Sequence, residues 1–268
     1  MNIQFTRRHW IGSVFASAMC LASHSDSAFA ATDERVFELR TYVTNEGKLP
    51  DLLNRFRNHT CHLFEKHGME NVGYWVPIEA ADGAANTLIY IIAHKSRADA
   101  PKSWAAFSKD PDWQVARQAS EFNGKILAKP PGSIFLNATD YSPLIQPSKD
   151  AGERVFELRT YTTPEGKLGA LNSRFRDHTL KLFIRHGMTH IGYWTPSQDK
   201  EQTDPRTLIY ILSHPSKEAG IKAFETFRVD PEWIAAKAAS ENNGALTLPQ
   251  PEGVKSIYMK ATDFSPIR

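Results

Sequence analysis

The sequence contains one long stretch of residues twice. Residues 35–42 return unchanged as residues 154–161, at an offset of 119 positions. Over residues 35–77, 28 of 43 positions are identical to those 119 positions later. The offset grows to 120 at Thr87 and to 123 at Ala138, so the extra residues mark loops. Chance does not produce such a match, so the chain is a tandem duplication of one structural unit.

Within one unit, the hydrophobic pattern predicts the order strand, helix, strand, strand, helix, strand. The predicted strands cover 35–43, 72–76, 88–93 and 134–139, and the predicted helices cover 48–67 and 98–127. Asp110 and Pro111 are expected to break the second helix and restart it as cap and first residue. This βαββαβ order is the ferredoxin-like one, an α+β arrangement with helices on one face of the sheet. Two copies would bury their bare faces together, so we expect a pseudo-two-fold α+β barrel closed within one chain.

The first thirty residues predict an export signal peptide, before a first unit at 31–144, a linker at 145–152 and a second unit at 153–268. Arg7 and Arg8 precede a short apolar stretch, and Ala30 ends a small-residue cleavage pattern. The arginine pair resembles the twin-arginine signal, with ordinary secretion as the alternative. We therefore expect a periplasmic or secreted protein cleaved after Ala30. The mature chain would keep one cysteine, Cys61, expected as a buried and inert thiol.

The composition excludes several classes of function. The net charge is +2, from 32 basic and 30 acidic residues, which provides no basic field for nucleic acid. Two cysteines cannot form a disulfide scaffold. No stretch of the mature sequence predicts a membrane span. Glycine-rich phosphate loops, Gly-x-Ser-x-Gly elbows and His-Glu-x-x-His motifs are absent from the sequence, so no cofactor is assigned.

Several short motifs carry a family resemblance. They are Phe-Glu-Leu-Arg-Thr-Tyr, Gly-Lys-Leu, Arg-Phe-Arg-x-His, His-Gly-Met and Gly-Tyr-Trp, and each occurs in both units. Together they resemble the NIPSNAP family over residues 34–144 and 153–267. The resemblance implies a dimeric α+β barrel fold, which agrees with the order of elements above. It does not imply a particular reaction.

Strand alternation predicts which side chains line the barrel. We expect the apolar set, with Phe37 and Leu39, to meet the helices and the polar set to point inward. The predicted ligand-binding residues are Glu38, Arg40, Tyr42, Glu157, Arg159 and Tyr161. The candidate acid or base residues are His94, His214, Tyr90 and Tyr210. The alternative interpretation is that the Glu and Arg side chains bind no ligand and pair with one another in a buried network whose hydrogen bonds are all made.

The helices carry further histidines and arginines. His59 and His62 stand three apart, but Lys181 replaces the second of them in the repeat, and no metal site is predicted. His67 and His186 are expected at helix C-termini, where a charged imidazole is favourable. Arg55, Arg57, Arg174 and Arg176 are expected on solvated helix faces. Which residue of Tyr74-Trp75 lines the barrel is left open.

Three hypotheses follow. The first is a protein that binds a small polar or anionic organic ligand inside the barrel. The second is an enzyme that oxidises or isomerises a small organic substrate. The third is a scaffold that acts through its outer surface. Higher oligomers remain open in all three.

Overall fold

The computed structural model describes residues 1–2, 33–148, 152–197 and 206–268. Nearly all of the predicted signal peptide and the cleavage position after Ala30 therefore lie outside the described residues. In the described part of the chain, no helix combines the length and hydropathy that crossing a bilayer requires.

Both units have the predicted order of elements. The first contains β1 (Val36–Val43), α1 (Leu49–Arg55), η1 (Phe56–Thr60), α2 (Cys61–Lys66), β2 (Met69–Pro77), η2 (Ala80–Asp82), β3 (Thr87–His94), α3 (Ala100–Lys109), α4 (Pro111–Ser120) and β4 (Gly132–Ala138). The second contains β5 (Val155–Thr162), α5 (Leu168–Arg174), η3 (Phe175–Thr179), α6 (Leu180–Arg185), β6 (Thr189–Pro196), β7 (Thr207–His214), α7 (Lys217–Arg228), α8 (Pro231–Ser240) and β8 (Val254–Ala261). The break at Asp110 is confirmed, because its side chain accepts the N–H of Asp112 at 2.8 Å and caps α4.

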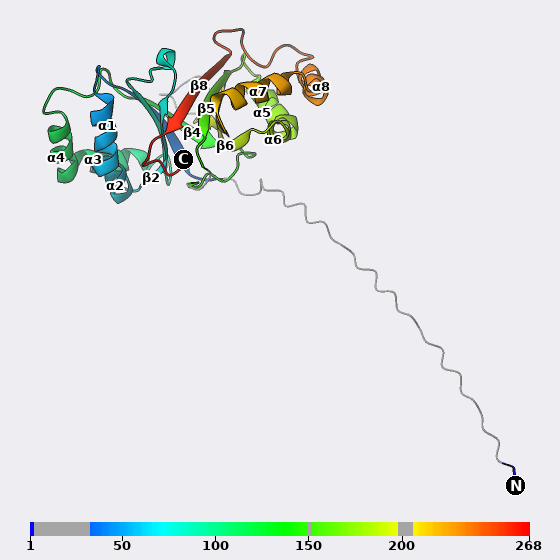
Figure 1. The fold of residues 1–268 in the computed structure, drawn as a ribbon, viewed down its shortest axis with the longest axis horizontal. Coiled ribbons are helices and arrows are strands. Elements are labelled where there is room, and N and C mark those ends of the chain that lie inside the picture. Colours follow the sequence, from blue (N-terminus) through cyan, green and yellow to red (C-terminus); the bar gives the residue numbers. More distant parts are fainter. Residues whose placement is uncertain (3–32, 149–151, 198–205) are drawn as a thin grey trace.

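The eight strands form one closed antiparallel barrel in the order β1-β3-β2-β8-β5-β7-β6-β4. Each unit contributes a four-stranded ferredoxin-like sheet, and the pairs β2–β8 and β4–β6 join the two sheets. Helices α1–α4 cover one side of the barrel and α5–α8 cover the other (Figure 1). The predicted barrel closed within one chain is therefore confirmed, and closure leaves no sheet edge exposed.

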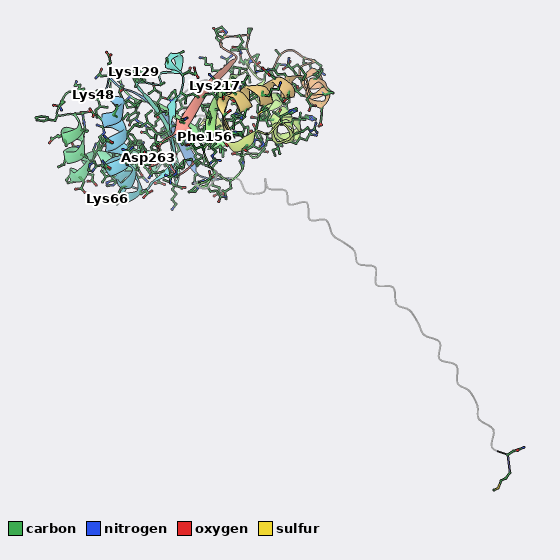
Figure 2. The ribbon with its side chains drawn as sticks, in the orientation of Figure 1. Lys48, Lys66, Lys129, Phe156, Lys217 and Asp263 are labelled. Carbon is green, nitrogen blue, oxygen red and sulfur yellow. The ribbon has the colours of Figure 1, made fainter. Side chains whose placement is uncertain are left out.

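The barrel interior is apolar. All eight strands contribute to one buried cluster that includes Phe37, Leu39, Phe156 and Leu158. Phe156 lies near the middle of the molecule, between the two groups of helices (Figure 2). The prediction that Phe37 and Leu39 meet the helices is therefore wrong. Aliphatic and aromatic side chains fill this space, where few hydrogen-bond partners are offered.

Trp75 and Trp194 occupy the barrel interior, while Tyr74 and Tyr193 face the helices. Each indole lies over a glycine two residues earlier on its own strand. A Cβ at Gly73 would come within 2.1 Å of the Trp75 ring, and one at Gly192 within 2.4 Å of the Trp194 ring. The Gly-Tyr-Trp motif therefore has a packing role, since only glycine leaves room for the indole.

Candidate functional site

The polar residues of the first strands lie between the sheet and the helices. We predicted that Glu38, Arg40, Tyr42, Glu157, Arg159 and Tyr161 point into the barrel, and this orientation is wrong. Tyr42 packs with α1 and η1 residues, and Glu38 accepts a hydrogen bond from Trp104 of α3. Tyr90 and Tyr210 lie on the same outer faces, and so do His94 and His214. Both carboxylates have their hydrogen-bond partners on this side of the sheet, mainly from neighbouring strands.

Glu38 is the centre of the cluster in the first unit. Its carboxylate meets His94 Nε2 at 2.9 Å and accepts from Trp104 Nε1 at 2.8 Å and Ser133 Oγ at 2.6 Å. Arg40 Nη1 donates to the same carboxylate. Burial by itself raises the pKa of Glu38, but these hydrogen bonds and the charge on Arg40 outweigh it and lower the pKa to about 2. Glu38 is 1% exposed and fully satisfied.

Glu157 is the centre of the matching cluster in the second unit. It meets His214 Nε2 at 3.0 Å, Ser256 Oγ at 2.6 Å and Arg159 Nη1 at 2.5 Å. The place of Trp104 is taken by Phe224, and the Arg159 guanidinium lies 4.1 Å from the centre of that ring.

The two arginines differ in their remaining contacts. Arg159 donates to the hydroxyls of Tyr210 at 2.9 Å and Tyr161 at 3.2 Å. In the first unit, Arg40 Nε and the Tyr90 hydroxyl are both buried without a hydrogen-bond partner among the described residues. The alternative interpretation was a buried Glu–Arg network with all its hydrogen bonds made. It describes the second cluster well, but in the first cluster some donors have no partner in the described part of the chain.

The candidate acid or base residues are enclosed. His94, His214, Tyr90 and Tyr210 are each at most 2% exposed. A general acid or base must come within hydrogen-bond reach of its substrate. Their catalytic role stays a prediction, and the observed contacts explain these residues as structural.

One turn of π-helix interrupts the first helix of each unit. It covers Phe56–Thr60 and Phe175–Thr179, within the Arg-Phe-Arg-x-His motif. Arg55 and Arg174, immediately before these turns, are buried, and their guanidinium groups lie about 5 Å from the ring centres of Trp113 and Trp233. The prediction that these two arginines are solvated is wrong. Hydrophobic periodicity gives no signal of a π-turn.

Arg57 and Arg176 are exposed, as predicted, and connect the units. Arg57 holds both carboxylate oxygens of Asp263 at 2.7 Å. Arg176 holds Asp140 in the same way, at 2.9 and 2.7 Å. Asp263 of the second unit therefore lies beside the helices of the first (Figure 2).

The helix histidines have different environments. His59 and His62 are exposed, and the described residues contain no group of three potential metal ligands. His67 and His186 end their helices as predicted, where they contact the capping carboxylates of Asp110 at 2.6 Å and Asp230 at 2.9 Å. Cys61 is half-buried rather than buried, and burial raises the pKa of its thiol to about 12.

A cavity of about 160 Å³ lies between the sheet and the helices of the second unit. Tyr161, Phe175, Phe183, Phe227 and Trp233 form its aromatic wall, and Arg174, Lys237, Glu241 and Thr247 are its main polar lining. Arg174 donates to Glu241 at 2.7 Å, while its Nε is buried without a partner in the described part of the chain. Among the predicted site residues, Tyr161 alone lines this cavity.

Comparisons with known proteins agree with the duplication and the fold. A family model described as NIPSNAP matches residues 37–143 and again residues 156–266. A NipSnap homolog from Dictyostelium discoideum is 27% identical over 157 residues, which are 56% of this chain and 58% of that protein. The chain thus covers less than two thirds of the length of this curated relative.

Two solved structures share the overall fold. They are monooxygenase candidates from Lactobacillus acidophilus and Fusobacterium nucleatum, with TM-scores of 0.53 and 0.54 and identities of 12% and 8%. Each comparison covers 85% of this chain, and 94% and 92% of the respective structures. At such identities the likeness concerns the fold alone.

Proposed function

The chain belongs to the NIPSNAP family, and from this premise we propose that it binds a small organic molecule between the sheet and helices of its second unit. The cavity beside Tyr161 carries this proposal. It is concave, mainly aromatic and furnished with a few polar groups, which is the usual composition of a small-molecule site.

The lining defines the ligand class. The aromatic wall suits a flat or compact apolar body. The Arg174 side chain is only 3% exposed, and its Nε–H has no partner among the residues that the structure describes, so a ligand oxygen would satisfy a buried donor. We therefore propose a ligand with an anionic or hydrogen-bond-accepting group on a small apolar body. A volume of about 160 Å³ suits a single aromatic ring.

The duplication supports a specific role for Thr247. The matching position in the first unit is Leu127, whose side chain packs on the core there. Equivalent backbone hydrogen bonds align the two positions, from Ala128 N to Val43 O and from Leu248 N to Thr162 O. The shorter threonine removes apolar volume beside Tyr161, where the second unit has its cavity.

The test is ligand-observed fluorine NMR with 4-fluorophenol and 4-fluorobenzoate. We expect saturable binding to the wild type and at least about tenfold weaker binding to Thr247→Leu, which fills the cavity. Thr247→Val keeps the side-chain size and should bind as the wild type does. Leu127→Thr changes the matched position in the other unit and should leave the existing site unaffected. Equal binding by wild type and Thr247→Leu would disprove this location.

We also propose that this binding takes place outside the cytoplasm. The support is the arginine pair, the short apolar stretch and the small-residue pattern ending at Ala30. This proposal is independent of the cavity.

A further inference from the structure

A polar groove lies on the first unit, between α1, the π-turn η1 and α4. Helices α1 and α4 contact each other on the side of the molecule away from the second unit (Figure 1). The groove has a volume of about 260 Å³, close to the lower end of the range of about 300–1,000 Å³ that is usual for small-molecule sites. It is separate from the cavity beside Tyr161, which is lined by other residues.

The groove can both donate and accept hydrogen bonds. Three amide side chains line it, Asn54 from α1, Asn58 from η1 and Asn123 from the turn after α4. An amide group carries an acceptor oxygen and two N–H donors. Asn58 and Asn123 are exposed, and their side chains have no hydrogen-bond partner within the described ranges. Both amides can therefore exchange bound water for a ligand.

Arg55 lies at the base of the groove, with a side chain only 3% exposed. Its Nη1 contacts Ser120 Oγ at 3.2 Å and Glu121 Oε1 at 3.4 Å, whereas the equivalent Arg174 holds Glu241 at 2.7 Å. Burial lowers the pKa of Arg55, because Glu121 offsets the loss of water only in part. A further oxygen acceptor in the groove would complete the contacts of this guanidinium.

The equivalent lysines of the two units make different contacts. Lys48, at the N-terminal end of α1 (Figure 2), donates to Asp51 Oδ2 at 3.0 Å. In the second unit Ala170 replaces the aspartate, and Lys167 donates instead to the carbonyl oxygen of Asn243 at 2.8 Å. Asn243 lies in the turn after α8, so Lys167 connects the two sides of the equivalent groove. Asp51 holds Lys48 on its own helix, and this keeps the groove of the first unit open.

The charges of the lining favour a neutral ligand. Apart from the imidazole of His59, the ionisable side chains that line the groove are Asp51 and Arg55, and each already has an ion-pair partner. An anion would meet the carboxylate and a cation would meet the guanidinium. Ala116 and Ala119 provide a small apolar surface without filling the space. A ligand with several hydroxyl groups suits this lining, since each hydroxyl both donates and accepts.

We propose that this groove binds a small neutral polyol, such as a monosaccharide. Its hydroxyl groups bond to the amides of Asn54, Asn58 and Asn123, one hydroxyl oxygen accepts from Arg55, and the C–H face of its ring lies on Ala119. The π-turn supports the proposal, because it carries Asn58 and because such turns are frequent at functional sites. This site and the cavity beside Tyr161 do not depend on each other.

The experiment is a saturation-transfer-difference NMR titration of the full chain with glucose and myo-inositol. Two comparison compounds accompany them: cyclohexanol, which keeps a six-membered ring with one hydroxyl, and gluconate, which adds a carboxylate. We expect both polyols to bind saturably, with a Kd of about 1 mM for an open groove. Cyclohexanol and gluconate should bind at least about tenfold more weakly.

Ala119→Leu fills the groove and should weaken the binding of both polyols by at least about tenfold. Ala239→Leu is the matched control, because Ala239 has the equivalent place on α8, and it should bind the polyols as the wild type does. Both alanines are exposed on helices, and leucine is a strong helix former, so both variants should fold.

Asp51→Ala gives the first unit the residue of the second. It removes an acceptor from the lining and releases Lys48, which can then reach the carbonyl of Asn123 as Lys167 reaches Asn243. We expect at least about tenfold weaker binding of both polyols. The stability should change little, because exposed ion pairs contribute little to it.

Three results would overturn the proposal. The first is the absence of saturable binding of both polyols to the wild type. The second is unchanged polyol affinity in Ala119→Leu or in Asp51→Ala. The third is binding of gluconate or cyclohexanol as tight as that of glucose. The affinity for 4-fluorophenol should be equal in wild type and Ala119→Leu, so failure of this site is distinguishable from failure of the cavity beside Tyr161.

Discussion

Glu38 and Glu157 are buried between the sheet and the helices as charged groups, because hydrogen-bond donors surround each carboxylate. Their carboxylates are at most 1% exposed, and burial alone would favour the neutral form. Histidine, serine and arginine partners reverse this preference in both units, and Trp104 adds a further donor in the first. The pKa of each carboxyl is consequently lowered, which links the charge state of these residues to the stability of the fold.

The first prediction concerns pH. Because the pKa of Glu38 falls from 4.5 to about 2 on folding, its stabilising contribution is complete above pH 4.5 and is lost as the pH falls toward 2. The loss should be on the order of 3 kcal/mol. Denaturant unfolding of wild type and Glu38→Gln across this range should show the difference in free energy shrinking as the pH falls. A difference that stays constant with pH would contradict the assignment.

The second prediction concerns the pair formed by Glu38 and Arg40. Removing one partner from a buried pair leaves the other charge uncompensated, so Glu38→Ala and Arg40→Ala should each cost about 3–5 kcal/mol of unfolding free energy. The double variant should cost less than the sum, because the orphaned charge is gone. Losses below about 1 kcal/mol in both single variants would indicate an exposed pair and contradict the observed contacts.

At the scale of the element, the π-turn is the least expected feature of the helices. Such turns are rare and often occur at functional sites. Here the turn accompanies the burial of Arg55 and Arg174, and the second of these lines the cavity beside Tyr161. The hydroxyls of Thr60 and Thr179 also donate to the carbonyls of these arginines, at 3.2 Å in both units.

The third prediction tests this bond. Thr60→Val and Thr179→Val keep the side-chain shape but remove the hydrogen bond from the hydroxyl to the arginine carbonyl. Each should lower the free energy of unfolding by about 1 kcal/mol, measured by chemical denaturation. The two units serve as matched controls for each other, and the losses should be similar. No loss in either variant would show that the hydroxyls do not stabilise the turn.

At the scale of the whole molecule, two seams hold the barrel together. They are the pairings of β2 with β8 and of β4 with β6. Two ion pairs between the units, Arg57–Asp263 and Arg176–Asp140, reinforce them. A single unit would leave its edge strands and the apolar inner face of its sheet in water.

The fourth prediction follows from these seams. A fragment of residues 31–144 should form a homodimer or aggregate, because a second sheet must cover its inner face. Light scattering coupled to size-exclusion chromatography measures the state, with the full chain as the reference. A stable soluble monomer of the fragment would show that the unit can fold without its copy.

The fifth prediction concerns export. If the arginine pair directs the chain to the twin-arginine route, replacing Arg7 and Arg8 by lysine should reduce the amount of protein outside the cytoplasm. Cell fractionation followed by immunoblotting measures this. Undiminished export would indicate the general secretory route.

The sequence by itself determined the elements and their arrangement. The repeat, the alternation in residues 35–43 and the cap at Asp110 are local signals, and local backbone physics is enough to interpret them. Two bare sheets that need mutual cover then lead to a barrel within one chain. The family follows from motifs such as Gly-Tyr-Trp, whose glycine makes room for the indole.

Only the tertiary structure decided which face of each strand points inward. Strand alternation places Phe37 and Glu38 on opposite faces of the sheet. It does not say which face meets the helices, because both faces of a barrel sheet are buried. The partners of Glu38 and Glu157 come mostly from neighbouring strands, which only the folded sheet brings together, and Trp104 adds a donor from a helix 66 residues away in the chain. The differences between the units are of the same kind. Thr247 is visible in the sequence, but the cavity beside it depends on what packs around it in space.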